Sequence, residues 1–127
     1  MKIAALIARI LMGLVFVVFG LNRFVRFLPP DPLPAGLAGQ FLGALIQSHH
    51  LYVVAALQLV GGALLLVNRY VPLALVILGP VIVNIFLYHL FMDRVGLPYA
   101  SILVVLWGIL AWQHRQAFAG LFVQREA

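Results

Sequence analysis

The amino-acid sequence predicts an all-α integral membrane protein, a four-helix bundle with a short amphipathic helix in the long loop between its first and second spans. Two observations lead to this prediction. First, 65% of the 127 residues are hydrophobic and only 9% are charged, whereas soluble domains carry about 25% charged residues to keep their surfaces in water. Second, the charges stand singly between apolar runs, and four runs have the roughly 20 residues that a helix needs to cross a bilayer. We therefore predict one transmembrane domain over residues 1–127.

The first predicted span covers residues 3–26 and carries one charge near its beginning, that of Arg9. We expect the aliphatic stem of Arg9 to let its guanidinium reach the lipid headgroups. The run is similar to a signal peptide, but no cleavage site of small residues follows it, so we expect a retained span.

The long connection that follows has two halves of different composition. Four prolines lie between residues 28 and 34, and proline lacks the backbone N–H that a helix interior needs. Residues 36–48, by contrast, place Leu37, Phe41 and Leu45 on one helical face. A helix of this length is too short to cross the bilayer, so we expect it to lie on the membrane or to cap the bundle.

Three further spans follow, separated by short polar stretches. The second covers residues 51–68 and is uncharged. The third covers 71–92, begins with Pro72 in its first turn and carries Pro80 in its middle, where we expect a kink. The fourth covers 97–113 and is followed by a polar tail.

Glycines in the first two spans predict closely packed helices. Gly13 and Gly20 are one heptad apart, and Gly61 and Gly62 are adjacent. Because glycine has no side chain, these positions allow two helix backbones to approach each other, which is a common role of small residues in membrane bundles.

Four spans place both termini on the same side of the membrane. Basic residues are more numerous on that side, where Lys2, Arg9, Arg69, Arg115 and Arg125 stand against Arg23, Arg26 and Arg94 on the other. Cytoplasmic loops of membrane proteins carry the excess of Lys and Arg. We therefore expect a multi-pass protein with cytoplasmic termini.

Several classes of function lack the residues that they need. There are no cysteines for a disulfide framework or a zinc-thiolate site, and the sequence shows no other metal-binding cluster. Although the net charge is +5, the basic residues form no patch that would bind nucleic acid. The sequence also lacks paired carboxylates, a nucleophile–base pair and a phosphate-binding loop. Since Arg9 and His89 are nearly the only ionisable groups inside the spans, any chemistry requires a borrowed cofactor.

The few polar residues inside the spans are the candidates for function, because each is costly in a bilayer unless it has a partner. We predict that six of them form a polar cofactor-binding cluster in the bundle core, toward the outer leaflet: Asn22, Arg23, Gln58, Asn84, Tyr88 and His89. Asn84 and Tyr88 are four residues apart and share a helix face. His89 precedes Asp93 by four residues, a spacing that lets this carboxylate pair with an imidazolium or fix the tautomer of a neutral ring.

Several interpretations of these side chains stay open. The ring of His89 is suited to carry a proton, to donate a hydrogen bond to a quinone carbonyl, to ligate haem opposite His49 or His50, or only to join two helices. Gln58 is expected to form a structural hydrogen bond between helices. Arg23 is expected either to anchor the span at the interface or to face inward and hold an anionic or quinone headgroup.

Nearly the whole chain resembles a known family. Besides Gly13, the similar segments are GLNRF at 20–24, LPPDPLP at 28–34, QLVGGALLL at 58–66, NRYVPLAL at 68–75 and GPVIVNIFLYHLF at 79–91. With these motifs the chain resembles the DoxX-like proteins, small four-span membrane proteins related to the DoxX and DoxD subunits of quinone-linked oxidoreductases. The chain differs from the common family pattern in having Gln58 in place of a Glu and Arg23 in place of a Lys. The first difference removes the obvious proton acceptor within the membrane.

The resemblance implies a bacterial cytoplasmic (inner) membrane protein with a role beside quinones in redox or sulfur metabolism. We therefore expect an accessory subunit of a quinone-linked membrane oxidoreductase, with quinone favoured over haem as the cofactor. In this interpretation His89 binds a quinone carbonyl, Asn84 or Tyr88 orients it, and Arg23 supplies positive potential. The expected partners are membrane lipids, oxidoreductase subunits or further copies of the chain, and no nucleic acid. The alternative is a non-catalytic membrane scaffold or lipid-handling protein with no redox role.

Overall fold

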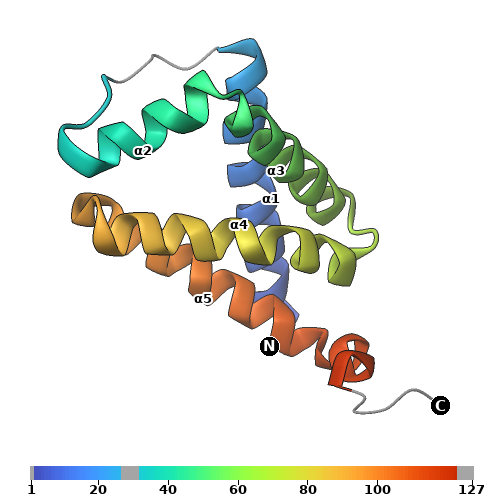
Figure 1. Cartoon of the computed structure of the whole chain (residues 1–127). Coiled ribbons are helices and arrows are strands. Elements are labelled where there is room, and N and C mark those ends of the chain that lie inside the picture. The colour runs from blue at the N-terminus through green and yellow to red at the C-terminus, as the bar shows by residue number, and fades with distance from the viewer. Residues whose placement is uncertain (1, 27–31, 123–127) are drawn as a thin grey trace.

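The fold is entirely helical over the residues that the computed structural model describes, 2–26 and 32–122 (Figure 1). Its elements are α1 (Lys2–Val25), α2 (Gly36–Gln47), α3 (His50–Val67), α4 (Val71–Phe91), η1 (Arg94–Gly96), α5 (Leu97–Gln113) and η2 (Arg115–Phe122). Four segments, namely α1, α3, α4 and η1 with α5, are long and apolar enough to cross a membrane. The predicted all-α membrane bundle is confirmed.

The helices α1 and α3 approach each other closely through their glycines. A Cβ atom added to Gly62 would lie 2.9 Å from the backbone nitrogen of Val17 and 3.0 Å from the carbonyl oxygen of Gly13. About two turns further along the helices, a Cβ atom on Gly20 would lie 2.9 Å from the carbonyl oxygen of Ala55. Any side chain at these positions would push the two backbones apart, so the predicted packing role of the glycines is confirmed.

The core of the bundle is apolar, and α4 contributes most to it. The largest fully buried side chains of the whole core are Met12, Phe16, Leu65, Leu75, Leu78, Leu103 and Leu110. In the described part of the chain no polar or charged residue is buried. Gly61 faces α4 whereas Gly62 faces α1, because a Cβ atom on Gly61 would lie 2.6 Å from the side chain of Leu78. Adjacent glycines thus let α3 pack against two different helices.

Arg9 forms hydrogen bonds inside the protein. Its half-buried guanidinium donates from Nη1 to the carbonyl oxygens of Leu65 at 2.5 Å and Leu66 at 3.4 Å. These carbonyls belong to the last turn of α3, where a positive charge is favourable. The carbonyl of Leu65 also accepts a hydrogen bond from the backbone N–H of Asn68 at 3.3 Å. Arg9 therefore caps the C-terminal end of α3, a contact that the sequence did not predict. The expected reach of its guanidinium to the headgroups stays a prediction.

Helix α4 continues through Pro80 without an interruption. The side chain of Asn84 donates to the carbonyl oxygen of Pro80 at 3.0 Å. The indole Nε1–H of Trp107 donates to the carbonyl oxygen of Leu75 at 2.9 Å and joins α5 to α4. The side chains of Asn84 and Trp107 thus both donate to main-chain carbonyls of α4.

Helix α2 covers one end of the bundle, beside the C-terminal end of α1 and the N-terminal end of α3 (Figure 1). It contacts α4 as well, because the ring centroids of Phe41 and Tyr88 lie 5.7 Å apart. We call this the α2 end: it comprises α2, the last turns of α1 and α4, the first turns of α3 and α5, and η1. The opposite end comprises α1 as far as Arg9, the last turn of α3, the connection to α4 with the first turn of α4, the last turn of α5, and η2. Capping of the bundle, one of the two expectations for the short helix, is confirmed.

Candidate functional site

One group of side chains at the α2 end is centred on Tyr52, in the first turn of α3. The guanidinium carbon of Arg23 lies 5.1 Å from the centroid of the Tyr52 ring. The ring centroid of Phe24, on α1, lies 5.4 Å from that of Tyr52. The ring of His49 stacks on the Tyr52 ring with centroids 5.9 Å apart. The Nε atom of Arg23 is buried and has no hydrogen-bond partner among the described residues. A cation over an aromatic face is stabilised electrostatically, so this group holds a positive charge at the end of α1.

A second group at the α2 end is centred on Tyr88 and His89, in the last turn of α4. Their rings meet edge to face with centroids 4.9 Å apart, and Phe41 of α2 meets Tyr88 edge to face. The Nδ1 atom of His89 lies 3.1 Å from the main-chain carbonyl oxygen of Asp93. Gly96 lies directly against the imidazole, since a Cβ atom there would overlap the ring. The ring is thereby held on two sides.

The bond to Asp93 determines what His89 offers to a ligand. A carbonyl oxygen only accepts hydrogen bonds, so Nδ1 carries the proton, and in the neutral ring Nε2 is an acceptor. The atom that fixes the tautomer is the main-chain oxygen of Asp93, whereas the spacing in the sequence suggested its carboxylate. In the neutral ring, Nε2 can therefore accept a hydrogen bond but not donate one, whereas the role predicted toward a quinone carbonyl needs a donor.

The structure brings together only part of the predicted cluster. Tyr88 and His89 are half-buried and in contact, and Arg23 contacts Tyr52. Asn84 is exposed, so its predicted position in the bundle core is wrong. Its amide bonds to the Pro80 carbonyl of its own helix and needs no partner from another. The other two predicted residues, Asn22 on α1 and Gln58 on α3, are half-buried.

Two aromatic residues of these groups were not among the predicted site residues. Phe41 was placed only on the apolar face of the short helix, and Tyr52 was not singled out. A signal for Tyr52 exists, because tyrosine near the beginning of a span is typical of the membrane interface. The contact of Phe41 with α4 depends on where α2 lies, which local sequence does not specify.

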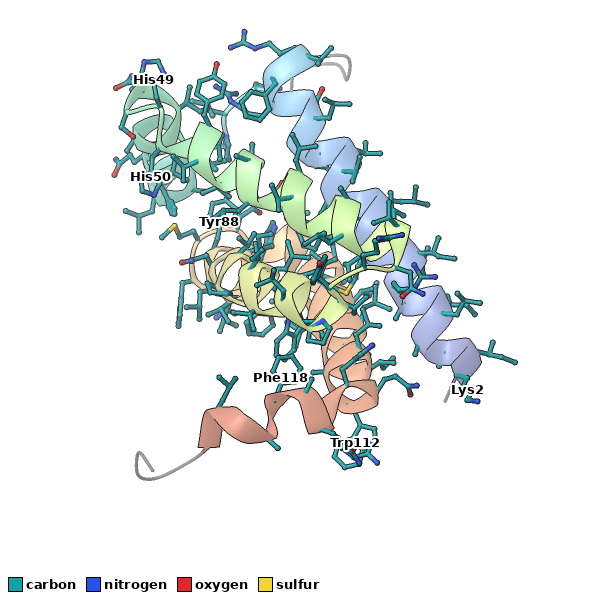
Figure 2. The ribbon with its side chains drawn as sticks, turned by 90° about the vertical axis from the view of Figure 1, so that its right-hand side faces the viewer. Lys2, His49, His50, Tyr88, Trp112 and Phe118 are labelled. Atoms are coloured by element: carbon teal, nitrogen blue, oxygen red, sulfur yellow. The ribbon has the colours of Figure 1, made fainter. Side chains whose placement is uncertain are left out.

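The histidines expected as alternative haem ligands have other contacts. His49 and His50 are exposed at the beginning of α3, and His49 stacks on Tyr52. Figure 2 shows both on the same side of the molecule as Tyr88, while Lys2, Trp112 and Phe118 lie toward the other side. Across residues 2–26 and 32–122 there is no group of three or more His, Asp or Glu side chains that could hold a metal ion. A haem between His89 and His49 would displace the ring contacts that both make.

Gly96→Ala is expected to displace the imidazole of His89. The φ angle of Gly96 is −87°, which alanine adopts readily, so the added methyl group affects the ring and not the backbone. Nitrogen-15 NMR of the histidine side chains should show the Nδ1–H tautomer in the wild-type protein and its loss in the variant. Gly120→Ala is the control, because a Cβ atom there meets open space. Unchanged His89 signals in Gly96→Ala would contradict the described packing.

A comparison with protein families supports the resemblance to DoxX proteins that the sequence motifs suggest. A family model described as DoxX matches residues 4–90, which is more than half of the chain and includes all six candidate site residues. No curated protein and no solved structure matches the chain. With this match and with four helices of membrane-spanning length and composition, the chain belongs to the DoxX family of membrane proteins.

Proposed function

We propose that this DoxX-family protein is an accessory subunit of a quinone-linked membrane oxidoreductase and that its α2 end binds the reduced, quinol headgroup. The observation that carries the proposal is the orientation of His89, whose Nδ1 is bonded to the Asp93 carbonyl. A quinol has hydroxyl groups that donate hydrogen bonds, whereas a quinone has only carbonyl acceptors. The Nε2 acceptor of the neutral ring is therefore complementary to the quinol.

The neighbouring side chains fit the same ligand. The rings of Phe41 and Tyr88 supply aromatic surface beside His89, and Tyr88 adds a hydroxyl. When bound, a quinol supplies two electrons and two protons. Imidazole is the side chain that best accepts and releases a proton near neutral pH, so His89 is suited to hold a proton at Nε2.

The first group of side chains contributes charge. The guanidinium of Arg23 lies over Tyr52 at the same end of the bundle. It supplies positive potential there, which favours an electron-rich oxygen over an apolar group. The amide of Gln58 does not ionise, so Gln58 cannot serve as the proton acceptor in place of His89.

We infer a bacterial inner membrane location with the opposite end in the cytoplasm. Among the described residues, the basic side chains Lys2, Arg9, Arg69 and Arg115 belong to the opposite end and Arg23, Arg26 and Arg94 to the α2 end. This distribution supports cytoplasmic termini under the positive-inside rule. It puts the proposed quinol site toward the outer leaflet.

His89→Asn is expected to weaken quinol binding about tenfold, since it removes one hydrogen bond of roughly 1–1.5 kcal/mol. The asparagine amide can still donate to the Asp93 carbonyl, but it has no atom at the position of Nε2. Binding of a short-chain quinol and of the matching quinone to the purified protein in nanodiscs, followed by calorimetry, measures the effect. The wild-type protein should prefer the quinol, and the variant should lose that preference.

His114→Asn is the matched control. The Nδ1 atom of His114 lies 3.0 Å from the carbonyl oxygen of Leu110, a similar bond at the opposite end of the bundle. Quinol binding should be unchanged in this variant. Equal affinity of the wild-type protein for quinol and quinone, or a His89→Asn variant with wild-type quinol affinity, would overturn the proposal. Membranes that lose quinone-linked activity with His89→Asn but not with His114→Asn would support the role as an oxidoreductase subunit.

A further inference from the structure

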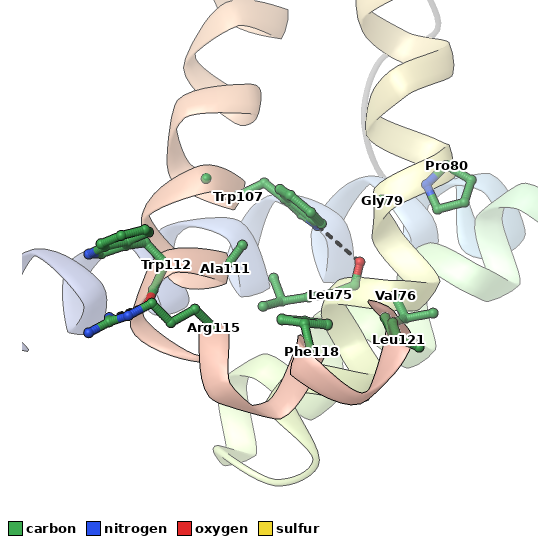
Figure 3. A pocket seen from close by; sticks show the side chains of 11 residues that line it. Leu75, Val76, Gly79, Pro80, Trp107, Ala111, Trp112, Arg115, Phe118 and Leu121 are labelled. Atoms are coloured by element: carbon green, nitrogen blue, oxygen red, sulfur yellow. Dashed lines mark hydrogen bonds between the residues drawn. The ribbon is translucent and has the colours of Figure 1, made fainter. Parts of the chain in front are cut away.

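An apolar groove of about 540 Å³ lies between α4 and α5 at the opposite end of the bundle, with η2 across one side (Figure 3). The hollow exists because small residues line it: Gly79 on α4, and Gly108 and Ala111 on α5. A Cβ atom added to Gly108 would meet no other atom within 4 Å. The volume falls within the range of typical ligand sites, and the lining is mostly apolar.

The groove has one charged side chain, Arg115, beside Trp112. Its guanidinium carbon lies 4.5 Å from the centroid of the Trp112 ring, and Nη1 donates to the Trp112 carbonyl oxygen at 2.9 Å. These contacts hold the side chain at the end of α5 while it stays exposed. A guanidinium has five N–H donors and binds phosphate oxygens in a bidentate manner, so donors other than the one bonded to Trp112 remain for an anion.

The charge of this end of the bundle favours an anionic ligand. Lys2, Arg9, Arg69 and Arg115 belong to it. The one carboxylate side chain within the described ranges is that of Asp93, at the α2 end. The described residues therefore give this end a net positive charge, which attracts anionic lipid headgroups.

We propose that the groove binds an acyl chain of an anionic phospholipid whose phosphate is held by Arg115. The apolar walls match a hydrocarbon chain, the tryptophan and arginine beside them match the interfacial region, and the net positive charge of this end selects an anionic headgroup. The site is at the other end of the bundle from the proposed quinol site and shares no residue with it. Either proposal can therefore fail without the other.

The protein carries its own probes for this site. Both of its tryptophans, Trp107 and Trp112, line the groove. Phospholipids with brominated acyl chains quench tryptophan fluorescence on contact. We expect brominated phosphatidylglycerol, diluted into phosphatidylcholine vesicles that contain the protein, to reach half-maximal quenching at a mole fraction about tenfold lower than brominated phosphatidylcholine does.

Two substitutions test the binding of the lipid headgroup and the binding of the acyl chain separately. Arg115→Gln should abolish the preference for phosphatidylglycerol, and Arg69→Gln, which removes an exposed charge from the same end, should leave it largely intact. Gly108→Leu adds a large side chain to the lining of the groove. Its Cβ atom meets no atom within 4 Å and leucine raises helix propensity, so we expect the variant to fold. It should lower quenching by both lipids, whereas Gly120→Leu, at an open position outside the groove lining, should not.

Trp112→Phe leaves Trp107 as the single probe and reports on the interior of the groove. The proposal is overturned if both brominated lipids quench the wild-type protein equally, or if Gly108→Leu is quenched like the wild-type protein. Either result would mean that the tryptophans contact only the general lipid surroundings. A preference for phosphatidylglycerol that survives Arg115→Gln would overturn the assignment of the phosphate to this side chain.

Discussion

Gly62→Leu is expected to destabilise the bundle by about 3 kcal/mol or more, the upper end of the cost of overpacking a core. The first carbon of the new side chain would lie 2.9 Å from the Val17 nitrogen and 3.0 Å from the Gly13 oxygen. Both are backbone atoms, so no side-chain rotation relieves the clash and α1 must move away from α3. Thermal unfolding in detergent, followed by the far-ultraviolet circular dichroism signal, measures the loss.

Gly108→Leu is the matched control for this prediction. It makes the same substitution in another membrane-spanning helix, where the new side chain meets open space. Its unfolding temperature should equal or exceed that of the wild-type protein, because leucine is the better helix former. If the two variants unfolded at the same temperature, the close approach of α1 and α3 would be refuted.

Arg9→Met is expected to cost about 1.5–3 kcal/mol, the usual contribution of hydrogen bonds to a charged group. The substitution keeps an apolar side chain of similar length but removes the donors that reach the carbonyls of Leu65 and Leu66. The last turn of α3 should fray. Hydrogen exchange should therefore accelerate at the C-terminal end of α3, together with a fall in the unfolding temperature.

Arg69→Met provides the comparison, since Arg69 is an exposed basic residue at the same end of the bundle. It should change stability by less than about 0.5 kcal/mol, as surface substitutions usually do. Equal effects of the two substitutions would contradict the capping role of Arg9 and leave only the predicted reach of its guanidinium to the headgroups. A larger effect of Arg9→Met, confined in hydrogen exchange to α3, would establish it as a cap.

The candidate site was only partly predictable. The polar residues Arg23, Tyr88 and His89 stand out because a polar side chain is rare and costly within an apolar span. The position of Asn84 could not be inferred in the same way. The helical period places Asn84 on the same face as Tyr88. The Asn84 amide nevertheless stays exposed, because its hydrogen bond to the Pro80 carbonyl gives it a partner within its own helix. Sequence spacing thus identified candidate groups but not which of them find partners within their own helix.

The hydrogen-bond role of His89 is a second feature that spacing leaves open. The four-residue separation from Asp93 brings the two residues together, but the main-chain oxygen and the carboxylate are both within reach of such a spacing. The end of α4 decides between them, because the chain leaves the helix at Met92 and turns the Asp93 carbonyl toward Nδ1. The acceptor character of Nε2 follows from that bond alone.

By itself, the sequence determined the four apolar spans, the short helix before the second span and the close packing at the glycines. These features follow from the length of apolar runs, from proline and from glycine, which act locally and are the same in any fold. The tertiary structure decided the partner of Arg9, the contact of Phe41 with Tyr88 and the groove beside Gly108. Each of these depends on how two helices cross. A nearly uniform apolar surface leaves that crossing unspecified until close-packed side chains select one arrangement.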